Sequence, residues 1–396
     1  MSNKHEITAI VMSLCINGLG VVRSLGRHGV PVIGLSDGKL LPGKHSRYVR
    51  DIWYYGGGES EMVDLLIRRG MEFSERPVLY PITDVGVRCV ADRIDEVLQF
   101  YRVGLPDSQL VESTMSKRGI SNWLTKLNLS APQTFFLDDA NQILDVAGEV
   151  DYPCIIKPEF RSAEFAQAAG QKAYRAENAE GLIAFYRSFC HVDPRAVVQQ
   201  WIPGGDEDIY FCLQYYNSKS ISLGSFTGRK IRQWPSLCGG TASCEPVDCP
   251  EIEKLSTQFF SELKFRGLCS MEFKRNPKTG EFLIVEPTVG RTDWQSDVAN
   301  ANGLPIPYIA YCDLTEQKVP LFIPTRRQLR WVRWSADRRA AQFYIDRGEL
   351  TFLRWISSIL GPIRWSVWSF DDPLPYLKII SRKISGKLNR IFSNVK

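Results

Sequence analysis

The sequence predicts an α/β fold that opens with a small doubly wound domain, continues as an α+β succession of strands and helices, and changes character after about residue 316. Three observations favour it. Residues 6–36 read as strand, turn, helix and strand, which indicates a parallel sheet. Residues 267–287 read as a β-hairpin, and five of the ten tryptophans fall within 331–368.

Length and composition are those of a globular protein with more than one domain. The 396 residues favour two to four domains, and 44% hydrophobic with 23% charged residues is ordinary for a soluble chain. A net charge of +5 is too small to indicate a nucleic-acid partner. Ten scattered cysteines without a Cys-x-x-Cys pair favour free thiols in a cytoplasmic protein, and no apolar run reaches the roughly 20 residues that span a bilayer.

The N-terminal segment carries part of a dinucleotide-binding fingerprint. "ITAIVMSLC" predicts a strand, "INGLG" a turn, "VVRSLGRHG" a helix and "VPVIGLS" the next strand. Gly18 and Gly20 match the fingerprint, but Arg23 occupies the place of its third glycine. The pattern therefore favours a tight turn over a cofactor cradle, and a dinucleotide-dependent oxidoreductase remains an alternative.

Two carboxylates in the hairpin suggest a cation site. Ser270 and Glu272 share one face of the first strand, and Ile284 and Glu286 share one face of the second. If the loop "NPKTG" is symmetric, Glu272 faces Ile284, and the two carboxylates lie diagonally on the same face. A one-residue slip would separate them. Each acid alone is typical of a strand-end salt bridge, whereas the pair together with phosphate oxygens suits Mg²⁺.

Cations and turns elsewhere in the chain fit an anionic ligand. The strand "PCIIK" ends at Lys157, and Lys117 begins the helix after "STMS"; both can act as point charges toward a phosphate. "QQWIPGGDED" (199–208) gives a strand end and turn whose backbone can read an adenine edge, with acids following for ribose hydroxyls. The strand "GRKIRQWP" holds three neighbouring cations, Arg229, Lys230 and Arg232.

The order of these motifs resembles the ATP-grasp superfamily, most closely its carboxylate–amine ligase-like members, often described beside polysaccharide genes. The resemblance covers nearly the whole chain, including the tail "RGELTFLRWISSILGPIRWSVWSFDDPLP". It implies a Rossmann-like pre-ATP-grasp domain at 1–110, a small ATP-grasp lobe at 111–195, a large lobe at 196–316 and a Trp-rich basic extension at 317–396.

The resemblance also implies residue roles, with ATP and Mg²⁺ as cofactors. Lys117 and Lys157 match phosphate-contacting lysines, and Glu272 and Glu286 match the magnesium carboxylates. Gln200, Trp201 and Ile202 match the adenine hinge, and Asp208 or Glu207 matches the ribose acid. The groups that hold the γ-phosphate or the acyl phosphate are matched by Arg229, Arg232 and Arg291.

This chain departs from the family pattern at two places, and both are expected to affect the reaction rate more than nucleotide binding. Many relatives carry asparagine where this chain has Thr288, and a hydroxyl is the weaker magnesium ligand. The loop after Lys157, "PEFRSAEFAQAAG", lacks the glycine and serine richness that covers phosphates in many members.

The resulting functional expectation is an ATP-dependent ligase that activates a small-molecule carboxylate as an acyl phosphate and joins it to an amine. Its expected context is cell-surface polysaccharide or amino-acid conjugate metabolism. The alternative is a catalytically weak ATP-binding protein that regulates or scaffolds. The two substrates, the oligomeric state and the number of Mg²⁺ ions are left open.

The C-terminal residues have the pattern of an interfacial helix. From Pro375 onward there are six basic residues and no acidic ones, and Leu377, Ile380 and Ile384 begin a series at helical spacing. One reading is contact with a membrane surface. The other is a terminal helix docked on its own domain.

Overall fold

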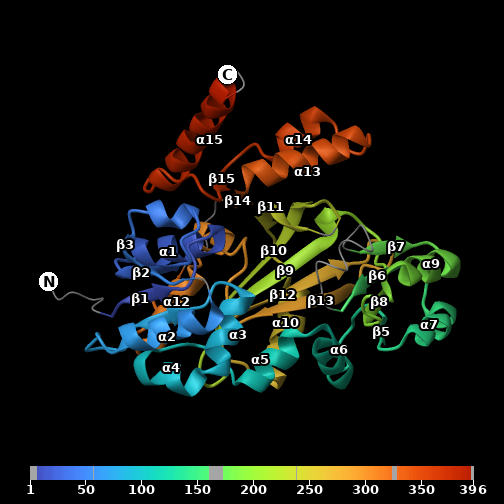
Figure 1. The fold of residues 1–396 in the computed structure, drawn as a ribbon, viewed down its shortest axis with the longest axis horizontal. Coiled ribbons are helices and arrows are strands. Elements are labelled where there is room, and N and C mark those ends of the chain that lie inside the picture. Colours follow the sequence, from blue (N-terminus) through green and yellow to red (C-terminus); the bar gives the residue numbers. More distant parts are fainter. Residues whose placement is uncertain (1–6, 57, 160–172, 238, 323–327, 394–396) are drawn as a thin grey trace.

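The computed structural model describes residues 7–56, 58–159, 173–237, 239–322 and 328–393, and side chains as far as Ser385. Three sheets divide the chain, as Figure 1 shows: a parallel sheet in the N-terminal domain, a small antiparallel sheet, and a seven-stranded sheet between them. This is the mixed α/β architecture expected from the sequence. Within the described ranges, no helix is both long and apolar enough to cross a membrane.

The N-terminal domain is a four-stranded parallel sheet in the order β3-β2-β1-β4, with helices on its faces. Its strands are β1 (Ala9–Val11), β2 (Val32–Ser36), β3 (Val49–Tyr54) and β4 (Val78–Tyr80). Its helices are α1 (Ile16–Arg27), η1 (Pro42–His45), α2 (Glu59–Gly70), α3 (Asp84–Asp92) and α4 (Ile94–Phe100).

The turn expected at "INGLG" is wrong, because α1 already begins at Ile16. Gly18 serves close packing instead of a turn, because a Cβ there would lie 1.8 Å from the Ser13 carbonyl oxygen. A Cβ on Gly20 would make only an ordinary contact, 3.4 Å from the Asp297 Cβ. The start of α1 is also occupied by protein, since the Asn17 amide donates to the Thr292 carbonyl at 2.5 Å. These contacts argue against a dinucleotide phosphate at the start of α1.

The small lobe is an antiparallel sheet in the order β5-β8-β6-β7, preceded by two helices. Its elements are α5 (Ser108–Met115), α6 (Lys117–Lys126), β5 (Thr134–Leu137), η2 (Ala140–Gln142), α7 (Ile143–Glu149), β6 (Cys154–Pro158), β7 (Tyr174–Ala176), α9 (Ala179–Phe189) and β8 (Ala196–Gln200). It has its own core, in which Leu137, Ile156 and Phe189 are fully buried.

The large lobe is built on the seven-stranded sheet, in the order β13-β12-β9-β10-β11-β14-β15. Its elements are η3 (Asp206–Asp208), β9 (Ile209–Tyr216), β10 (Ser222–Trp234), β11 (Gly240–Pro246), α10 (Pro250–Glu262), β12 (Gly267–Arg275), β13 (Phe282–Val289), α11 (Asp297–Ala301) and α12 (Ile306–Leu314). One face packs against α10 and α6, and the other against α1 and α12. The second face joins this lobe to the N-terminal domain.

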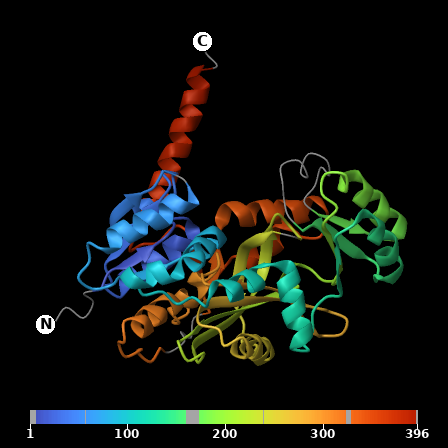
Figure 2. The ribbon, with the colours of Figure 1, turned by 60° about the horizontal axis from the view of Figure 1, so that its bottom comes forward.

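The C-terminal extension completes the large sheet and then leaves it. Two short strands, β14 (Arg330–Val332) and β15 (Ile363–Trp365), extend the sheet beyond β11. Between them α13 (Trp334–Asp346) and α14 (Phe352–Ser358) form a helical pair. The last helix, α15 (Leu374–Ser393), projects away from the rest of the protein in both views (Figures 1 and 2).

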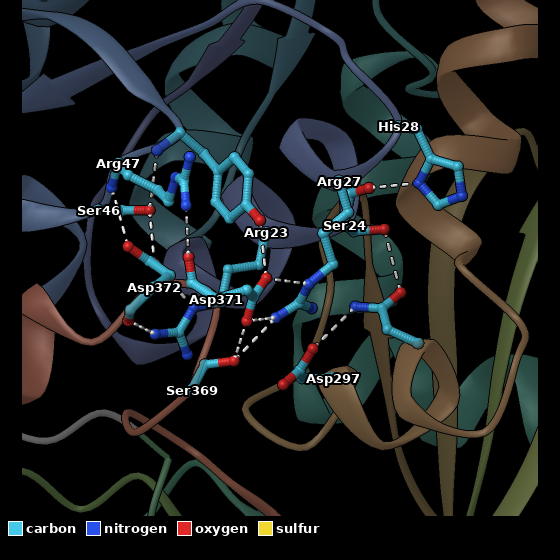
Figure 3. A network of polar contacts seen from close by, with 12 residues as sticks. Arg23, Ser24, Arg27, His28, Ser46, Arg47, Asp297, Ser369, Asp371 and Asp372 are labelled. Atoms are coloured by element: carbon cyan, nitrogen blue, oxygen red, sulfur yellow. Dashed lines mark hydrogen bonds and ion pairs between the residues drawn. The ribbon is translucent and has the colours of Figure 1, made fainter.

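A buried polar network anchors the extension to α1, as Figure 3 shows. The fully buried Asp372 accepts from Arg23 Nε at 2.9 Å, from Ser46 Oγ at 2.7 Å and from the Arg47 amide at 2.9 Å. Arg23 also donates to the carbonyl of Asp372 at 2.9 Å. The arginine at the third glycine position of the fingerprint is therefore a structural residue that is paired with the tail.

Candidate active site

The hairpin that carries the two glutamates differs in register from the symmetric arrangement expected from the sequence. Arg275 pairs with Phe282, so the loop contains six residues in place of five and the register slips by one. A bulge at Val285 then adds a second slip, since Phe273 pairs with Ile284 while Glu272 pairs with Glu286. Two slips of one residue restore the shared face. The carboxylates are therefore directly opposite each other, closer than the predicted diagonal.

Negative charge is concentrated at this pair. Glu286 is accessible from the cleft, yet the lobes enclose it closely enough that burial raises its pKa, and the charge of Glu272 raises the pKa further. The charges of Lys157 and Lys230 oppose this rise. Lys230 also forms a direct ion pair with the other glutamate, because its Nζ lies 2.7 Å from Glu272 Oε2. The geometry and the raised pKa both fit a site that a divalent cation would complete.

A cavity of about 330 Å³ separates Glu286 from the small lobe. Lys117 and Lys157 line it on the small-lobe side, and Ile284 to Pro287 line it on the β13 side. Lys117 is the first residue of α6, where the Ser116 side chain caps the helix, and its Nζ donates to the Glu159 carbonyl at 2.9 Å. The volume lies within the range of small-molecule sites. Two of the expected phosphate contacts thus share one cavity with one of the expected metal ligands.

The segment 200–208 connects the two lobes. Gln200 ends β8 in the small sheet, and the Trp201 amide donates to the Pro153 carbonyl at 3.1 Å; Ile202 is buried. The Asp208 carboxylate accepts from the Gly205 amide at 2.9 Å, which closes the turn.

Two further contacts fix this turn to the large lobe. The buried Asp206 accepts from the Gln233 amide at 2.9 Å, and Lys274 Nζ donates to the Gly205 carbonyl at 2.6 Å. Glu207 lies in the same turn and is exposed. The hinge segment and its acids are therefore held at the boundary between the lobes.

A second polar group lies along β13 from the glutamates. Thr288 pairs with Ser270, whose hydroxyl donates to Asp293. Arg291 contacts Asp293 at 3.3 Å and donates to Asp84 of α3 at 2.7 Å. The loop after β13 thus carries Arg291 to the junction with the N-terminal domain.

The structure does not bring Arg229 and Arg232 to the glutamates. Arg229 pairs in register with Tyr210, on the sheet face opposite Glu272, and its guanidinium lies 2.7 Å from Glu245. Arg232 is buried and lies 2.7 Å from Asp337 of α13. Lys230, between them, is the cation that reaches Glu272. Strand alternation could have identified Lys230 as the cation near Glu272. Lys230 shares a face with Gly228, and Gly228 lies across β9 from Glu272.

The described residues contain no group of three or more histidine, cysteine, aspartate or glutamate side chains arranged to hold a metal ion. A cation at Glu272 and Glu286 would therefore need further ligands from a bound substrate. The glycine-poor loop that follows Lys157 lies mostly outside the described residues.

Comparison with known proteins finds distant relatives. No protein-family model matches the chain. One curated protein, the carbamoyl phosphate synthase large chain of Methanothermobacter thermautotrophicus, is 23% identical over 237 residues. The match covers 57% of this chain and only 20% of that protein, so the chain spans about a fifth of its relative's length.

Solved structures match over most of the chain. The N5-carboxyaminoimidazole synthetase of Staphylococcus aureus, complexed with ADP, has a TM-score of 0.64 at 11% identity, covering 83% of this chain and 82% of that one. The phosphoribosylglycinamide synthetase of Anaerococcus prevotii has a TM-score of 0.61 at 13% identity, covering 82% and 79%. The biotin carboxylase domain of the Hydrogenobacter thermophilus 2-oxoglutarate carboxylase, with MgADP and bicarbonate, has a TM-score of 0.61 at 13% identity, covering 82% and 74%.

These likenesses define the class of fold. The chain has the ATP-grasp fold, with the Rossmann-like domain in front of the two lobes, as the resemblance in the sequence implied. The cavity between Lys117, Lys157 and Glu286 lies between the small lobe and the large one.

Proposed function

We propose that the protein is an ATP-dependent, ADP-forming carboxylate–amine ligase. The observation that carries the proposal is the direct opposition of Glu272 and Glu286 across the hairpin, with Glu286 lining the cavity between the lobes and its pKa raised by burial and by the charge of Glu272. Lys117 and Lys157 on the other side of the cavity support it. The ADP and MgADP complexes of the structural neighbours are consistent with the same nucleotide here.

In this proposal the nucleotide phosphates occupy the cavity between the lobes, where Lys117 and Lys157 bind them. Gln200, Trp201 and Ile202 do not line that cavity, and they bind the adenine edge beyond it. The carboxylate of Asp208 or Glu207 accepts a hydrogen bond from a ribose hydroxyl. Glu272 and Glu286 hold Mg²⁺, with Thr288 as a weak further ligand. Bound Mg²⁺ would supply positive charge next to the phosphate oxygens.

The residues of this chain then act by positioning and electrostatics. A substrate carboxylate oxygen attacks the γ-phosphorus, the bond to ADP breaks, and an amine later displaces phosphate from the acyl phosphate. Arg291 binds the acyl phosphate in this proposal, and its ion pairs with Asp84 at 2.7 Å and Asp293 at 3.3 Å hold the guanidinium in the loop after β13. Lys230 orients Glu272. Arg229 and Arg232 stabilise the fold in this scheme, because their guanidinium groups pair with Glu245 and Asp337.

The context that we propose is cytoplasmic metabolism of cell-surface polysaccharides or amino-acid conjugates, and its support is the sequence resemblance alone. A second candidate function is a weak ATP-binding protein that regulates or scaffolds. It is favoured by Thr288 in place of an amide and by the absence of Arg229 and Arg232 from the described glutamate pair.

One assay separates these functions. The protein is supplied with ATP, Mg²⁺, pools of carboxylic acids and hydroxylamine in place of the unknown amine. We expect a hydroxamate, with ADP and free phosphate as the other products. AMP and pyrophosphate would indicate adenylation and would contradict the mechanism. ATP binding without turnover for any acid would favour the scaffold.

We also propose that α15 binds an anionic membrane surface. Residues 317–396 contain 16 lysines and arginines against 5 aspartates and glutamates, whereas the rest of the chain contains more acids than bases. Leu377 and Ile384 are 48% and 54% exposed on α15, which projects from the protein (Figure 2). Burial lowers the pKa of His45 in η1, and the charges of Arg382 and Lys378 lower it further, so both cations lie at the base of the helix. An exposed apolar stripe flanked by cations is typical of interfacial helices.

The membrane proposal predicts co-sedimentation with anionic liposomes that depends on α15. Full-length protein should pellet with phosphatidylserine vesicles, less strongly as salt rises, and a chain ending at Pro375 should not. That truncation keeps Asp372 and so keeps the buried network. The matched charge control is Lys264→Glu with Lys278→Glu, two exposed lysines outside the extension. Equal pelleting by the full-length and truncated proteins would exclude the proposal.

A further inference from the structure

Arg333 differs from every comparable arginine in the described part of the chain. Among described arginines that are not exposed, it alone has no carboxylate oxygen within 4.0 Å. The others are Arg23, Arg93, Arg102, Arg118, Arg229, Arg232, Arg291, Arg330 and Arg364. A partly buried guanidinium normally has an anionic partner, because the protein must replace its lost hydration.

The backbone holds Arg333 at the edge of the large sheet. Its amide donates to the Ala242 carbonyl at 2.8 Å, at the point where β14 ends and α13 begins. Its guanidinium carbon lies 5.3 Å from the ring centroid of Trp294. Trp294 is 41% exposed, so one face of its ring remains accessible to a ligand. The stacked pair therefore presents both a cation and an aromatic surface.

The loop that carries Trp294 begins at the end of β13, the strand of Glu286. Trp294 follows Asp293, which accepts from Ser270 on the strand that carries Glu272. Arg291, three residues earlier in the same loop, is the proposed ligand of the acyl phosphate. The same loop thus carries the proposed acyl-phosphate ligand and the ring against which Arg333 stacks.

The electrostatic surroundings of Arg333 are positive. Burial lowers its pKa, and the charge of Arg339, one and a half turns along α13, lowers the pKa further. Arg339 itself lies over the ring of Trp234, 5.6 Å from its centroid. Two cations that destabilise each other in the free protein gain the most from an anion bound between or beside them.

We infer that Arg333, with Trp294 and Arg339, binds a second oxyanion of the acid substrate. The substrate class is then an acid with two anionic groups: the carboxylate that is activated, and a carboxylate or phosphate that Arg333 holds through its planar fork. This inference rests on the proposed ligase function for the identity of the first group. Oxyanion binding at Arg333 can be measured without turnover.

The first test is equilibrium binding of defined probes by calorimetry, at constant ionic strength, in the presence of Mg²⁺ and ADP. The dianions are malonate, succinate, glutarate and phosphonoacetate, and the monoanions are propionate, butyrate and valerate. We expect at least one dianion to bind roughly tenfold or more tightly than the monoanion of equal length, and Arg333→Gln to remove that difference. Phosphonoacetate against malonate distinguishes a phosphate-bearing substrate from a dicarboxylate.

The matched control is Arg354→Gln, which removes an exposed arginine from α14 of the same extension and should leave all affinities unchanged. Thermal unfolding without ligand gives a second readout. Arg333→Gln should not lower the melting temperature, because it removes a partly desolvated charge that faces Arg339. A lower melting temperature with unchanged dianion affinity would assign Arg333 a structural role and overturn the inference.

The two proposals fail in different ways. Equal wild-type affinity for dianions and monoanions overturns the second-oxyanion site, even if a hydroxamate forms. The absence of ATP turnover with every acid overturns the ligase, while dianion binding that Arg333→Gln abolishes would still establish the oxyanion site. With a turnover substrate, Arg333→Gln should raise KM for dianionic acids by at least about tenfold and leave kcat nearly unchanged.

Discussion

Replacing Glu286 with glutamine should lower turnover on the order of a hundredfold or more, while the protein folds normally. The substitution removes one charge from the proposed magnesium pair at nearly constant shape, and the loss of a well-placed electrostatic partner typically has this size. The measurement is ADP release in the hydroxylamine assay. Full activity would return Glu286 to the role of an ordinary strand-end acid.

The same substitution should raise thermal stability in the absence of nucleotide and Mg²⁺. Burial and the charge of Glu272 raise the pKa of Glu286 above its ordinary value of 4.5, so ionised Glu286 destabilises the folded protein. Below pH 4.5 the carboxyl is protonated in both folded and unfolded states, and the difference between wild type and Glu286→Gln should be small. It should grow as pH rises through the raised pKa and then stay constant.

The control is Glu281→Gln, an exposed glutamate of the same hairpin. It should change neither turnover nor melting temperature. Added Mg²⁺ with ADP should stabilise the wild type and the control more than Glu286→Gln. A Glu286→Gln protein that melts below the wild type at neutral pH would contradict the assigned electrostatics.

Replacing Asp372 with alanine should destabilise the protein by about 3–5 kcal/mol, because it leaves Arg23 as a buried charge without its partner. The substitution also removes the acceptor for Ser46 and for the Arg47 amide. Urea unfolding and hydrogen exchange measure the effect. Protection should fall together in α1 and in residues 366–376, although they are far apart in sequence.

Asp371 provides the matched control next in the chain. Its ion pair with Arg27 is partly exposed, with side chains 27% and 39% accessible, and its carboxylate also accepts from Tyr48 and Ser369, so Asp371→Ala should cost less than Asp372→Ala but more than an isolated surface pair. Equal effects of the two alanine variants would show that burial of the Asp372 pair adds nothing to stability.

The sequence predicted the hairpin and its acid pair because strand alternation is local. Glu272 and Glu286 lie on one face, as expected, but their direct opposition depends on a six-residue loop and on the bulge at Val285. Neither irregularity has a strong sequence signal. The loop and the bulge each shift the strand register by one residue, and the two shifts together keep the carboxylates on one face. A single shift would have put them on opposite faces, and the predicted acid pair would have been wrong.

The side-chain roles that the sequence did not predict depend on partners that lie far away along the chain. Arg229, Lys230 and Arg232 look equivalent in "GRKIRQWP", and only tertiary structure separates them: Lys230 reaches Glu272, while Arg232 is buried against Asp337. In the sequence, Arg23 only interrupts a cofactor-binding pattern, whereas in the structure it pairs with Asp372. Such partners lie on distant segments that no local pattern connects.

The Arg23–Asp372 pair also has a consequence for synthesis of the protein on the ribosome. The two residues are 349 positions apart. At the usual elongation rates, Asp372 is made roughly 20 to 70 seconds after Arg23. Throughout that interval, the nascent first domain contains an arginine that cannot be buried at low cost. The domain that is translated first is therefore expected to be among the last to reach its native state, and its isolated fragment 1–110 should not form a stable native core.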